Sequence, residues 1–202
     1  DYSVGRIIDK VGDLGIEENT IIIFTADNGT DQPVVSIKNN IFIDGAKGKT
    51  IDTGTHVPLI VSWSKKIESG IINKSLIDFS DFFPTICEAA GIKLNSNLDL
   101  DGVSFYNQLM GQDGPKRKWI HSWYSRGGGS SMNDETFEWV RNETYKFYRG
   151  NRFYNVKKDP NEKNKLSWNQ MTQEERKIQQ EFSNVLKSYN SLRNNTRINE
   201  SL

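Results

Sequence analysis

A continuous apolar run that ends in a polar triplet constrains the fold of this chain more than any other feature. Residues 21–26 read IIIFTA, and Asp27, Asn28 and Gly29 follow directly. A short β-branched run without polar alternation is typical of a strand buried on both faces of a parallel sheet. In open α/β sheets, ligands bind beyond the carboxyl ends of the strands, so the triplet occupies a position where a functional site is expected.

The segments on either side of this strand predict an α/β layer. Apolar residues recur at helical spacing over residues 4–14, and Gly15 follows where a left-handed C-terminal cap is expected. After a polar, glycine-containing stretch over residues 30–54, the run VPLIVSW predicts a second strand over residues 57–63. Ser80 is expected to cap a further helix that ends at Gly91.

The C-terminal part of the chain predicts a separate small layer. Between residues 119 and 156, aromatic segments alternate with glycine, asparagine and charged clusters, a pattern typical of a small antiparallel sheet. Thr172 and Glu175 form a capping-box pattern before an apolar stripe, so a terminal helix is expected to pack on that sheet. We therefore expect a division into residues 1–115, a subdomain over 116–190 and a polar tail over 191–202.

Composition and charge exclude several classes of partner. Lys+Arg and Asp+Glu are both 26, so no net field attracts nucleic acid, and no nucleic-acid partner is expected. The longest apolar runs are far shorter than the ~20 residues of a membrane helix, so no membrane span is expected. The single cysteine, Cys87, excludes an internal disulfide.

The strand-end triplet and one loop lysine are the candidate site residues. Asp27 offers a carboxylate and Asn28 an amide oxygen, and both are ligands that calcium or magnesium selects. An Asp-Asn-Gly triplet is also a common turn, because Asn and Gly tolerate positive φ. Lys47 stands between glycines, where a solvated loop lysine is the ordinary alternative. The residue types alone leave these alternatives open.

Five segments, in this order, carry a resemblance to a known family. They are NTIIIFTADNG at residues 19–29, GAKGKTIDTGTHVPLIV at 45–61, DFSDFFPTICEAAGI at 78–92, DGVSFYNQLMG at 101–111 and FYNVKKDPNEKNKL at 153–166. They resemble the sulfatase family of the alkaline phosphatase superfamily, in its C-terminal portion. The resemblance implies an α/β fold in which residues 1–115 form part of an alkaline-phosphatase-like parallel or mixed sheet with flanking helices. A small antiparallel sheet with a packed helix would follow.

The resemblance also implies an activity, a metal and site residues. The activity would be that of a sulfuric ester hydrolase acting on a sulfated small molecule or glycan, with periplasmic or extracellular location. Asp27 and Asn28 would be ligands of Ca²⁺, and Asp27 would also help to position or deprotonate the nucleophile. Lys47 matches the family lysine that contacts the sulfate group. His56 stands where many relatives have Arg, so neither it nor His121 is given a role.

The nucleophile motif of the family does not occur in this sequence. Sulfatases convert the first residue of C/S-x-P-x-R to formylglycine, whereas Cys87 is followed by EAAG and is expected to be a small core residue. The resemblance therefore implies that this chain is a fragment, that the nucleophile and an Asp-Asp pair precede Asp1, and that the chain alone is inactive. Apolar surface uncovered in such a fragment would be available for self-association.

Two other functions stay open on the sequence. The first is a phosphodiesterase or phosphonate monoester hydrolase of the same superfamily, since phosphoryl and sulfuryl groups share a tetrahedral shape. The second is a non-catalytic glycan-binding or structural piece that uses the C-terminal sheet and its aromatic residues, because a fold alone does not fix a function.

Overall fold

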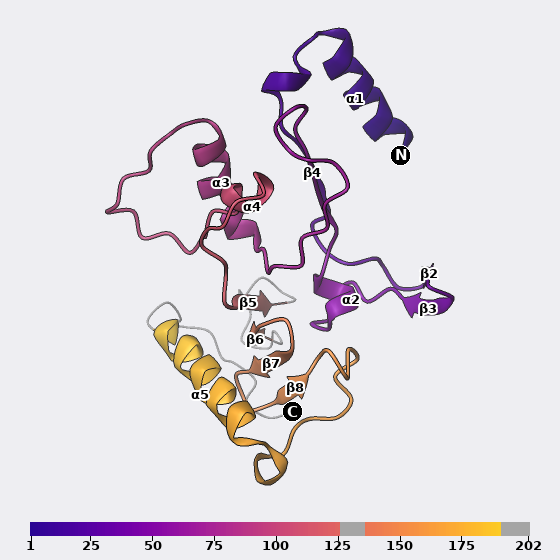
Figure 1. Cartoon of the computed structure of the whole chain (residues 1–202). Coiled ribbons are helices and arrows are strands. Elements are labelled where there is room, and N and C mark those ends of the chain that lie inside the picture. The colour runs from indigo at the N-terminus through magenta and orange to yellow at the C-terminus, as the bar shows by residue number, and fades with distance from the viewer. Residues whose placement is uncertain (126–135, 191–202) are drawn as a thin grey trace. The chain divides into compact units, whose positions relative to one another are not determined.

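The computed structural model of this chain describes residues 1–125 and 136–190 (Figure 1). The chain forms two compact units, each built from two segments: Asp1–Asp27 with Val57–Arg117, and Asn28–His56 with Lys118–Leu202. The polar tail predicted at residues 191–202 lies outside the described residues. The predicted boundary after residue 115 stays a prediction, and the structure adds that residues 28–56 belong with the C-terminal sheet.

The first unit contains most of the described helices and one pair of strands. Its elements are α1 (Tyr2–Asp13), a 3-10 turn (Glu17–Asn19), β1 (Ile22–Thr25), β4 (Leu59–Ser62), a second 3-10 turn (Phe79–Asp81), α3 (Phe82–Ala89) and α4 (Tyr106–Leu109). Gly15 has φ +63 and forms the left-handed turn predicted after α1. None of the residues of α1 is buried, and Ile7 and Ile8 of its apolar stripe are exposed.

The two strands of the first unit pair differently from the expectation. β1 and β4 are antiparallel, with Ile22 opposite Ser62 and Thr25 opposite Leu59. Among the described residues they form a two-stranded sheet, and Phe24 is 42% exposed. The apolar run correctly predicted a strand. Such a run indicates only that the strand tends to be buried, because it carries no information on the direction of the neighbouring strand. The parallel pairing expected for this strand is not found within the described part of the chain.

The start of α3 is held by aspartates and not by the predicted serine. Asp78 accepts from the Ser80 amide, and Asp81 accepts from the Asp78 amide, so Asp78 caps the turn before the helix. The prediction that Ser80 caps this helix is wrong, because its hydroxyl donates to Asp78 instead. The fully buried Asp81 carboxylate also accepts from the Arg117 Nε, 2.9 Å away, and from the Val103 amide. These bonds tie residues 101–104 to the helix.

The second unit is built around a four-stranded antiparallel meander, as predicted. Its strands are β5 (Ile120–Ser125), β6 (Thr136–Arg141), β7 (Tyr145–Tyr148) and β8 (Phe153–Asn155), in that order across the sheet. After a 3-10 turn (Trp168–Gln170), α5 (Gln173–Ser188) begins at the predicted Thr172 and Glu175 capping box. Figure 1 shows α5 beside this sheet. Phe182 and Leu186 of α5 pack on Val140, Phe147 and Phe153.

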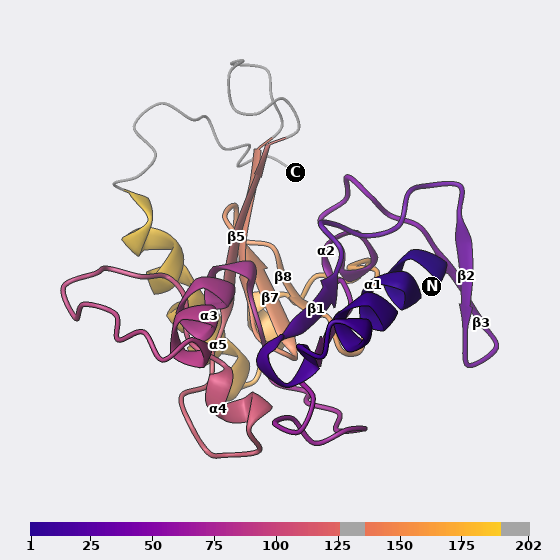
Figure 2. The same cartoon turned by 90° about the horizontal axis from the view of Figure 1, so that it is seen from above.

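The opposite face of this sheet carries a second set of side chains. Side chains alternate across a strand, so Trp139, Tyr148 and Tyr154 lie on the face away from α5 and form their own buried cluster. Residues 28–56 contact this face through hydrogen bonds described below. Their elements are the hairpin β2 (Val35–Lys38) and β3 (Ile41–Asp44) and the short helix α2 (Asp52–Thr55). Figure 2 shows α5 and α2 on opposite sides of the sheet.

The hairpin is an element that the sequence analysis took for part of a polar loop. β2 and β3 pair in register from Val35 opposite Asp44 to Lys38 opposite Ile41. Asn39 and Asn40 make the turn with φ 52 and 63, the backbone geometry of a two-residue hairpin loop with both residues left-handed. An Asn-Asn pair between two short β-branched runs was the signal that could have predicted it.

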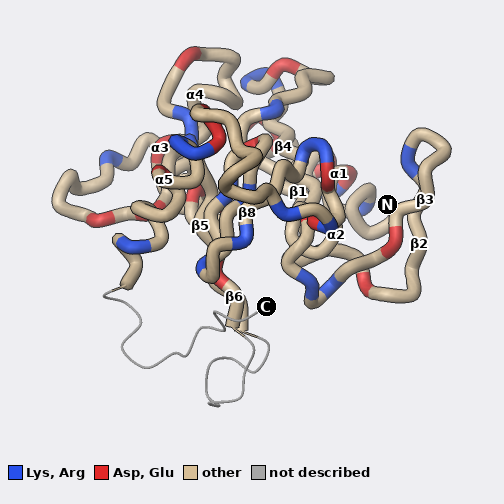
Figure 3. Tube along the Cα trace, turned by 90° about the horizontal axis from the view of Figure 1, so that it is seen from below, with Lys and Arg blue, Asp and Glu red and all other residues tan. Residues whose placement is uncertain are grey.

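Two global features bear on partners. No helix in the described ranges is long and apolar enough to cross a membrane. Lys and Arg, like Asp and Glu, are spread along the described trace, and neither sign is confined to one segment (Figure 3). Self-association through exposed apolar surface stays a prediction.

Candidate active site

The strand-end triplet forms a tight turn against a later segment of the chain. Asp27 follows the end of β1 by two residues and is exposed, while Asn28 is partly buried. The Gly29 N–H donates to the Gly54 carbonyl at 2.9 Å. A Cβ at Gly29 would lie 2.1 Å from the Thr53 carbonyl oxygen. No other residue fits here without a backbone shift, so glycine is needed for this close approach.

The loop that carries Lys47 closes on the segment that follows the triplet. The Lys47 N–H donates to the Thr30 carbonyl at 2.9 Å, and the Lys49 N–H donates to the Ala46 carbonyl at 2.8 Å. Gly48 has φ +81, which a glycine adopts without strain. The side chain of Lys47 is exposed. Lys47, which lies 19 positions after Asn28 in the sequence, is thus hydrogen-bonded through its backbone to Thr30, the second residue after Asn28.

The structure joins two of the three predicted site residues within one compact unit. Asn28 and Lys47 both belong to the second unit, and Asp27 is the last residue of a segment of the first. The bonds from Gly29 to Gly54 and from Lys47 to Thr30 bring the two motifs together in the unit that holds Asn28.

The donor atoms of the triplet suit a hard cation in kind. A carboxylate from Asp27 and an amide oxygen from Asn28 are the ligand types of calcium, which takes six to eight oxygens. Across residues 1–125 and 136–190, no three His, Cys, Asp or Glu residues gather in a group that could hold a metal. The triplet therefore offers two oxygens of the right chemistry and not a full coordination sphere.

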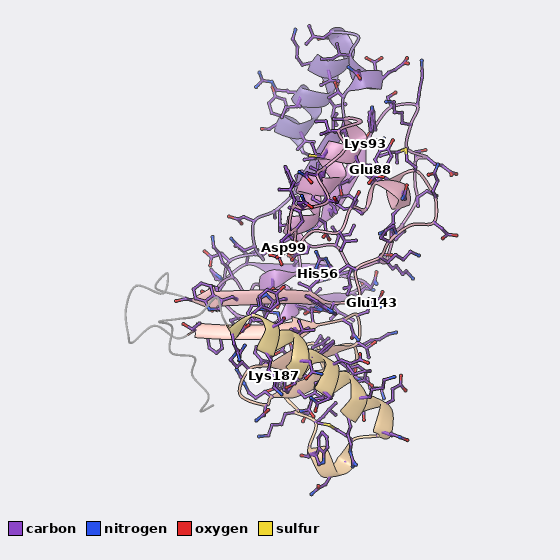
Figure 4. The ribbon with its side chains drawn as sticks, turned by 90° about the vertical axis from the view of Figure 1, so that its left-hand side faces the viewer. His56, Glu88, Lys93, Asp99, Glu143 and Lys187 are labelled. Carbon is purple, nitrogen blue, oxygen red and sulfur yellow. The ribbon has the colours of Figure 1, made fainter. Side chains whose placement is uncertain are left out.

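The two histidines and the cysteine lie in different surroundings. His121 Nε2 lies 2.8 Å from Glu138 Oε1, and its ring stacks on Tyr189 with centroids 3.8 Å apart. His56 is exposed at the end of α2, where it is labelled in Figure 4. Cys87 is a free thiol on α3 and is partly buried.

A buried polar cluster next to the Lys47 loop was missed by the sequence analysis. The Lys146 amine of β7 donates to the Thr50 carbonyl and, at 2.8 Å, to Glu162 Oε1. The Tyr148 hydroxyl lies 2.6 Å from Glu162 Oε2 and 2.9 Å from Thr50 Oγ1. Because a phenol has one proton, Tyr148 donates to the carboxylate and the Thr50 hydroxyl donates to the phenol oxygen.

An ion pair adds a second link between this loop and the sheet. The Arg141 guanidinium of β6 donates to the Asp52 carboxylate in α2. Thr50 and Asp52, three and five residues after Lys47, are therefore both held by side chains of the sheet. The charged residues within the aromatic strand sequences WVR and YKFY were the signal that could have pointed to these contacts.

The electrostatics of the cluster follow from its burial. The Lys146 side chain is fully buried, and burial lowers the pKa of this amine while the neighbouring Glu162 carboxylate opposes that shift. Burial, and then the negative charge of Glu162, raise the pKa of Tyr148. The Lys146 amine also lies 4.9 Å from the Trp139 ring centroid. A buried charge is tolerable in this position because it is paired with Glu162 and makes two hydrogen bonds.

Two family models match the chain. The model described as Sulfatase matches residues 1–92, and the model described as N-sulphoglucosamine sulphohydrolase, C-terminal, matches residues 47–191. Between them they include the triplet, the Lys47 loop and the C-terminal sheet with α5.

Curated relatives include several sulfatases. The uncharacterized sulfatase YdeN of Escherichia coli is 37% identical over 129 residues, which are 61% of this chain and 22% of that protein. The ulvan-active sulfatase of Formosa agariphila is 30% identical over 69% of this chain and 25% of that protein. Human arylsulfatase A is 34% identical over 55% of this chain and 22% of that protein. The chain thus spans about a quarter of the length of the curated relatives it matches.

Solved structures show the same fold. A protein solved in complex with its substrate D-glucosamine-2-N,6-O-disulfate superposes with a TM-score of 0.72 at 22% identity, over 93% of this chain and 38% of that one. The PsFucS1 sulfatase of Pseudoalteromonas sp. superposes with a TM-score of 0.69 at 22% identity, over 96% of this chain and 42% of that one. With a family model that matches residues 47–191 and the order of motifs seen in the sequence, this chain belongs to the sulfatase family.

Proposed function

We propose that the protein carrying this chain is a sulfuric ester hydrolase whose sulfate site includes Asp27, Asn28 and Lys47. The closure of the Lys47 loop on the segment after Asn28 is the observation that supports this most directly. It brings a cationic residue and a metal-type ligand from separate motifs to neighbouring backbone positions. Membership of the sulfatase family supports the same reaction class.

In this proposal Lys47 stabilises negative charge as the ester bond breaks. Its ammonium is exposed and therefore able to meet a bound sulfate group. A fixed cation at the departing ester oxygen acts on charge that is larger in the transition state than in the ground state. Asp27, also exposed, positions the nucleophile hydroxyl or accepts its proton.

We propose that Asp27 and Asn28 hold Ca²⁺ in the complete protein. Their oxygens match calcium in type and supply two of the six to eight ligands it takes. When bound, the ion would neutralise sulfate oxygens and favour attack at sulfur.

We propose that the nucleophile is a formylglycine outside these 202 residues, since the sequence contains no C/S-x-P-x-R motif. The hydrated aldehyde oxygen would attack sulfur, the alcohol would leave, and the sulfated hydrate would collapse to release sulfate and restore the aldehyde. The chain by itself would then be inactive, and an aryl sulfate assay of the isolated 202 residues that showed turnover would contradict this part of the proposal.

We propose a sulfated glycan or small molecule as the substrate. One protein of the same fold was solved with a disulfated glucosamine as its substrate, and one relative is named for activity on ulvan.

The decisive assay compares three ester classes on the complete protein. An aryl sulfate, an aryl phosphodiester and an aryl phosphonate monoester with the same phenol are offered at equal concentration, and phenol release is followed. We expect kcat/KM for the sulfate to be the highest of the three. A higher value for either phosphorus ester would replace the proposal with the phosphohydrolase alternative, and glycan binding without any turnover would support the binding-module alternative.

A further inference from the structure

A buried cluster on the C-terminal sheet forms hydrogen bonds with Thr50, in the loop that carries Lys47. Lys146 and Tyr148 lie two residues apart on β7, so both side chains point to the face of the sheet opposite α5. From this face they reach Thr50, 96 and 98 positions earlier in the sequence, and Glu162, which follows β8. Every one of these residues belongs to the second compact unit.

The cluster cannot act on a substrate directly. The Lys146 side chain is fully buried and that of Glu162 is 7% exposed. Both oxygens of the Glu162 carboxylate are used, one by Lys146 and one by Tyr148. The Lys146 amine also donates a hydrogen bond to the backbone carbonyl of Thr50. Any effect of these groups on catalysis must therefore pass through the position of the loop.

The backbone at Glu162 adopts a conformation that few residues with a side chain take. Glu162 has φ +54, in the left-handed region that is unfavourable for a residue with a side chain. Its N–H donates to the Asp159 carbonyl at 3.1 Å in the turn of the segment DPNE. A glycine would relieve the strain, yet only a side chain with two acceptor oxygens can bridge Lys146 and Tyr148 here.

Few residues separate this cluster from Lys47. Thr50 is three residues after Lys47, and the intervening Lys49 is bonded to Ala46. Buried Gly54 packs closely against the same turn: a Cβ added there would lie only 2.3 Å from the Lys49 carbonyl oxygen. The sheet thus holds the loop at Thr50 while the segment after the triplet holds it at Lys47.

We propose that Lys146, Tyr148 and Glu162 are positioning residues that fix the Lys47 loop for sulfate ester cleavage. The effect of these residues on the reaction rests on the proposed function. Their effect on the position of the loop rests on the contacts alone. It gives the C-terminal sheet and the segment DPNE a part in the reaction, although none of their clustered side chains reaches the substrate. The effect on rate is expected to fall on kcat, since Lys47 would act mainly on charge that develops in the transition state.

The test must separate a positioned loop from a merely stable fold. Removing one partner leaves a buried group unpaired and endangers folding, whereas replacing both members of a buried ion pair by apolar residues is often neutral for stability. The double variant Lys146→Met/Glu162→Leu in the complete protein is therefore the main probe. Lys187→Met and Glu143→Gln, both exposed and labelled in Figure 4, are the matched controls.

Two readouts are taken on protein whose thermal unfolding midpoint is preserved. Amide hydrogen exchange of a peptide covering residues 45–56 reports on the loop without any substrate, and kcat and KM for an aryl sulfate report on the reaction. In the double variant we expect exchange in the loop to be about 10- to 100-fold faster, the factor that follows from losing a hydrogen bond to a charged group. We expect kcat to fall by about 10- to 100-fold with KM little changed, and Tyr148→Phe to show smaller changes in the same direction.

The outcomes decide between the readings. Native exchange in the loop of a folded double variant would overturn the proposal, and so would faster exchange with native kcat. If the unaltered protein cleaves no sulfate ester, the proposed function fails separately, and the exchange arm alone decides whether the cluster holds the loop. Controls that change the loop as much as the double variant would also overturn it.

Discussion

Gly54 provides a sharp test of how tightly the Lys47 loop is packed. It is buried within α2, and a Cβ added there would lie 2.3 Å from the Lys49 carbonyl oxygen and 2.4 Å from that of Ala46. Both atoms are backbone, so relief requires the loop to move by about 0.7 Å to reach even the 3.0 Å limit of real Cβ contacts. In an open helical position the same change would instead stabilise the protein by about 0.5–1 kcal/mol.

The packing effect should outweigh the helix propensity. We expect Gly54→Ala to lower the free energy of unfolding by about 1–3 kcal/mol, the usual range for overpacking. Because a displacement approaching 1 Å can cost about 10²-fold in rate, kcat for an aryl sulfate should fall by roughly 10- to 100-fold. Gly5→Ala is the matched control, since Gly5 lies in α1 with no atom within 4 Å of its added Cβ. Urea unfolding of the complete protein is the assay, and a Gly54→Ala variant as stable as the native protein would refute the packing argument.

Further predictions concern the second unit. Phe153→Ala, at a fully buried site between the sheet and α5, should lower the free energy of unfolding by about 3–5 kcal/mol in urea titrations, and a loss below about 1 kcal/mol would mean that this core is not formed as described. Thr172→Ala removes the capping box of α5 and should cost about 0.5–2 kcal/mol, with Ser167→Ala, which makes no side-chain cap bond, as the control. The hydrogen bond from the Thr172 backbone lowers the pKa of Glu175, so this contribution to stability is present above the unfolded pKa of about 4.3 and is lost as pH falls through the lower folded value. As the pH is lowered below 4, the free energy of unfolding should therefore fall less steeply in Glu175→Gln than in the native protein. Equal slopes would contradict a lowered pKa of Glu175 in the folded protein.

Local signals predicted the elements whose formation depends on nearby residues. The capping box at Thr172, the left-handed Gly15 and the aromatic strands of the meander were all predicted from sequence and are found. Each depends on chain chemistry within a few positions, which a sequence displays directly.

Features that depend on partners far along the chain were not predicted. The antiparallel pairing of β1 with β4 joins residues about 40 positions apart, and an apolar run does not encode that direction. Lys146 stood out only as a charge within an aromatic strand, and its partners Thr50 and Glu162 lie on separate segments. The association of residues 28–56 with the C-terminal sheet follows from such contacts and has no local signal.

The role of Lys47 is the central claim, and one substitution tests it most directly. Lys47→Ala in the complete protein should lower kcat/KM for an aryl sulfate by about 10²–10³-fold, the range for losing one preorganised charge-stabilising group, with the free energy of unfolding nearly unchanged because the side chain is exposed. Lys49→Ala, an exposed lysine two residues away in the same loop, is the control and should stay within about threefold of the native rate. A native rate in folded Lys47→Ala protein, or an equal loss in both variants, would contradict the account.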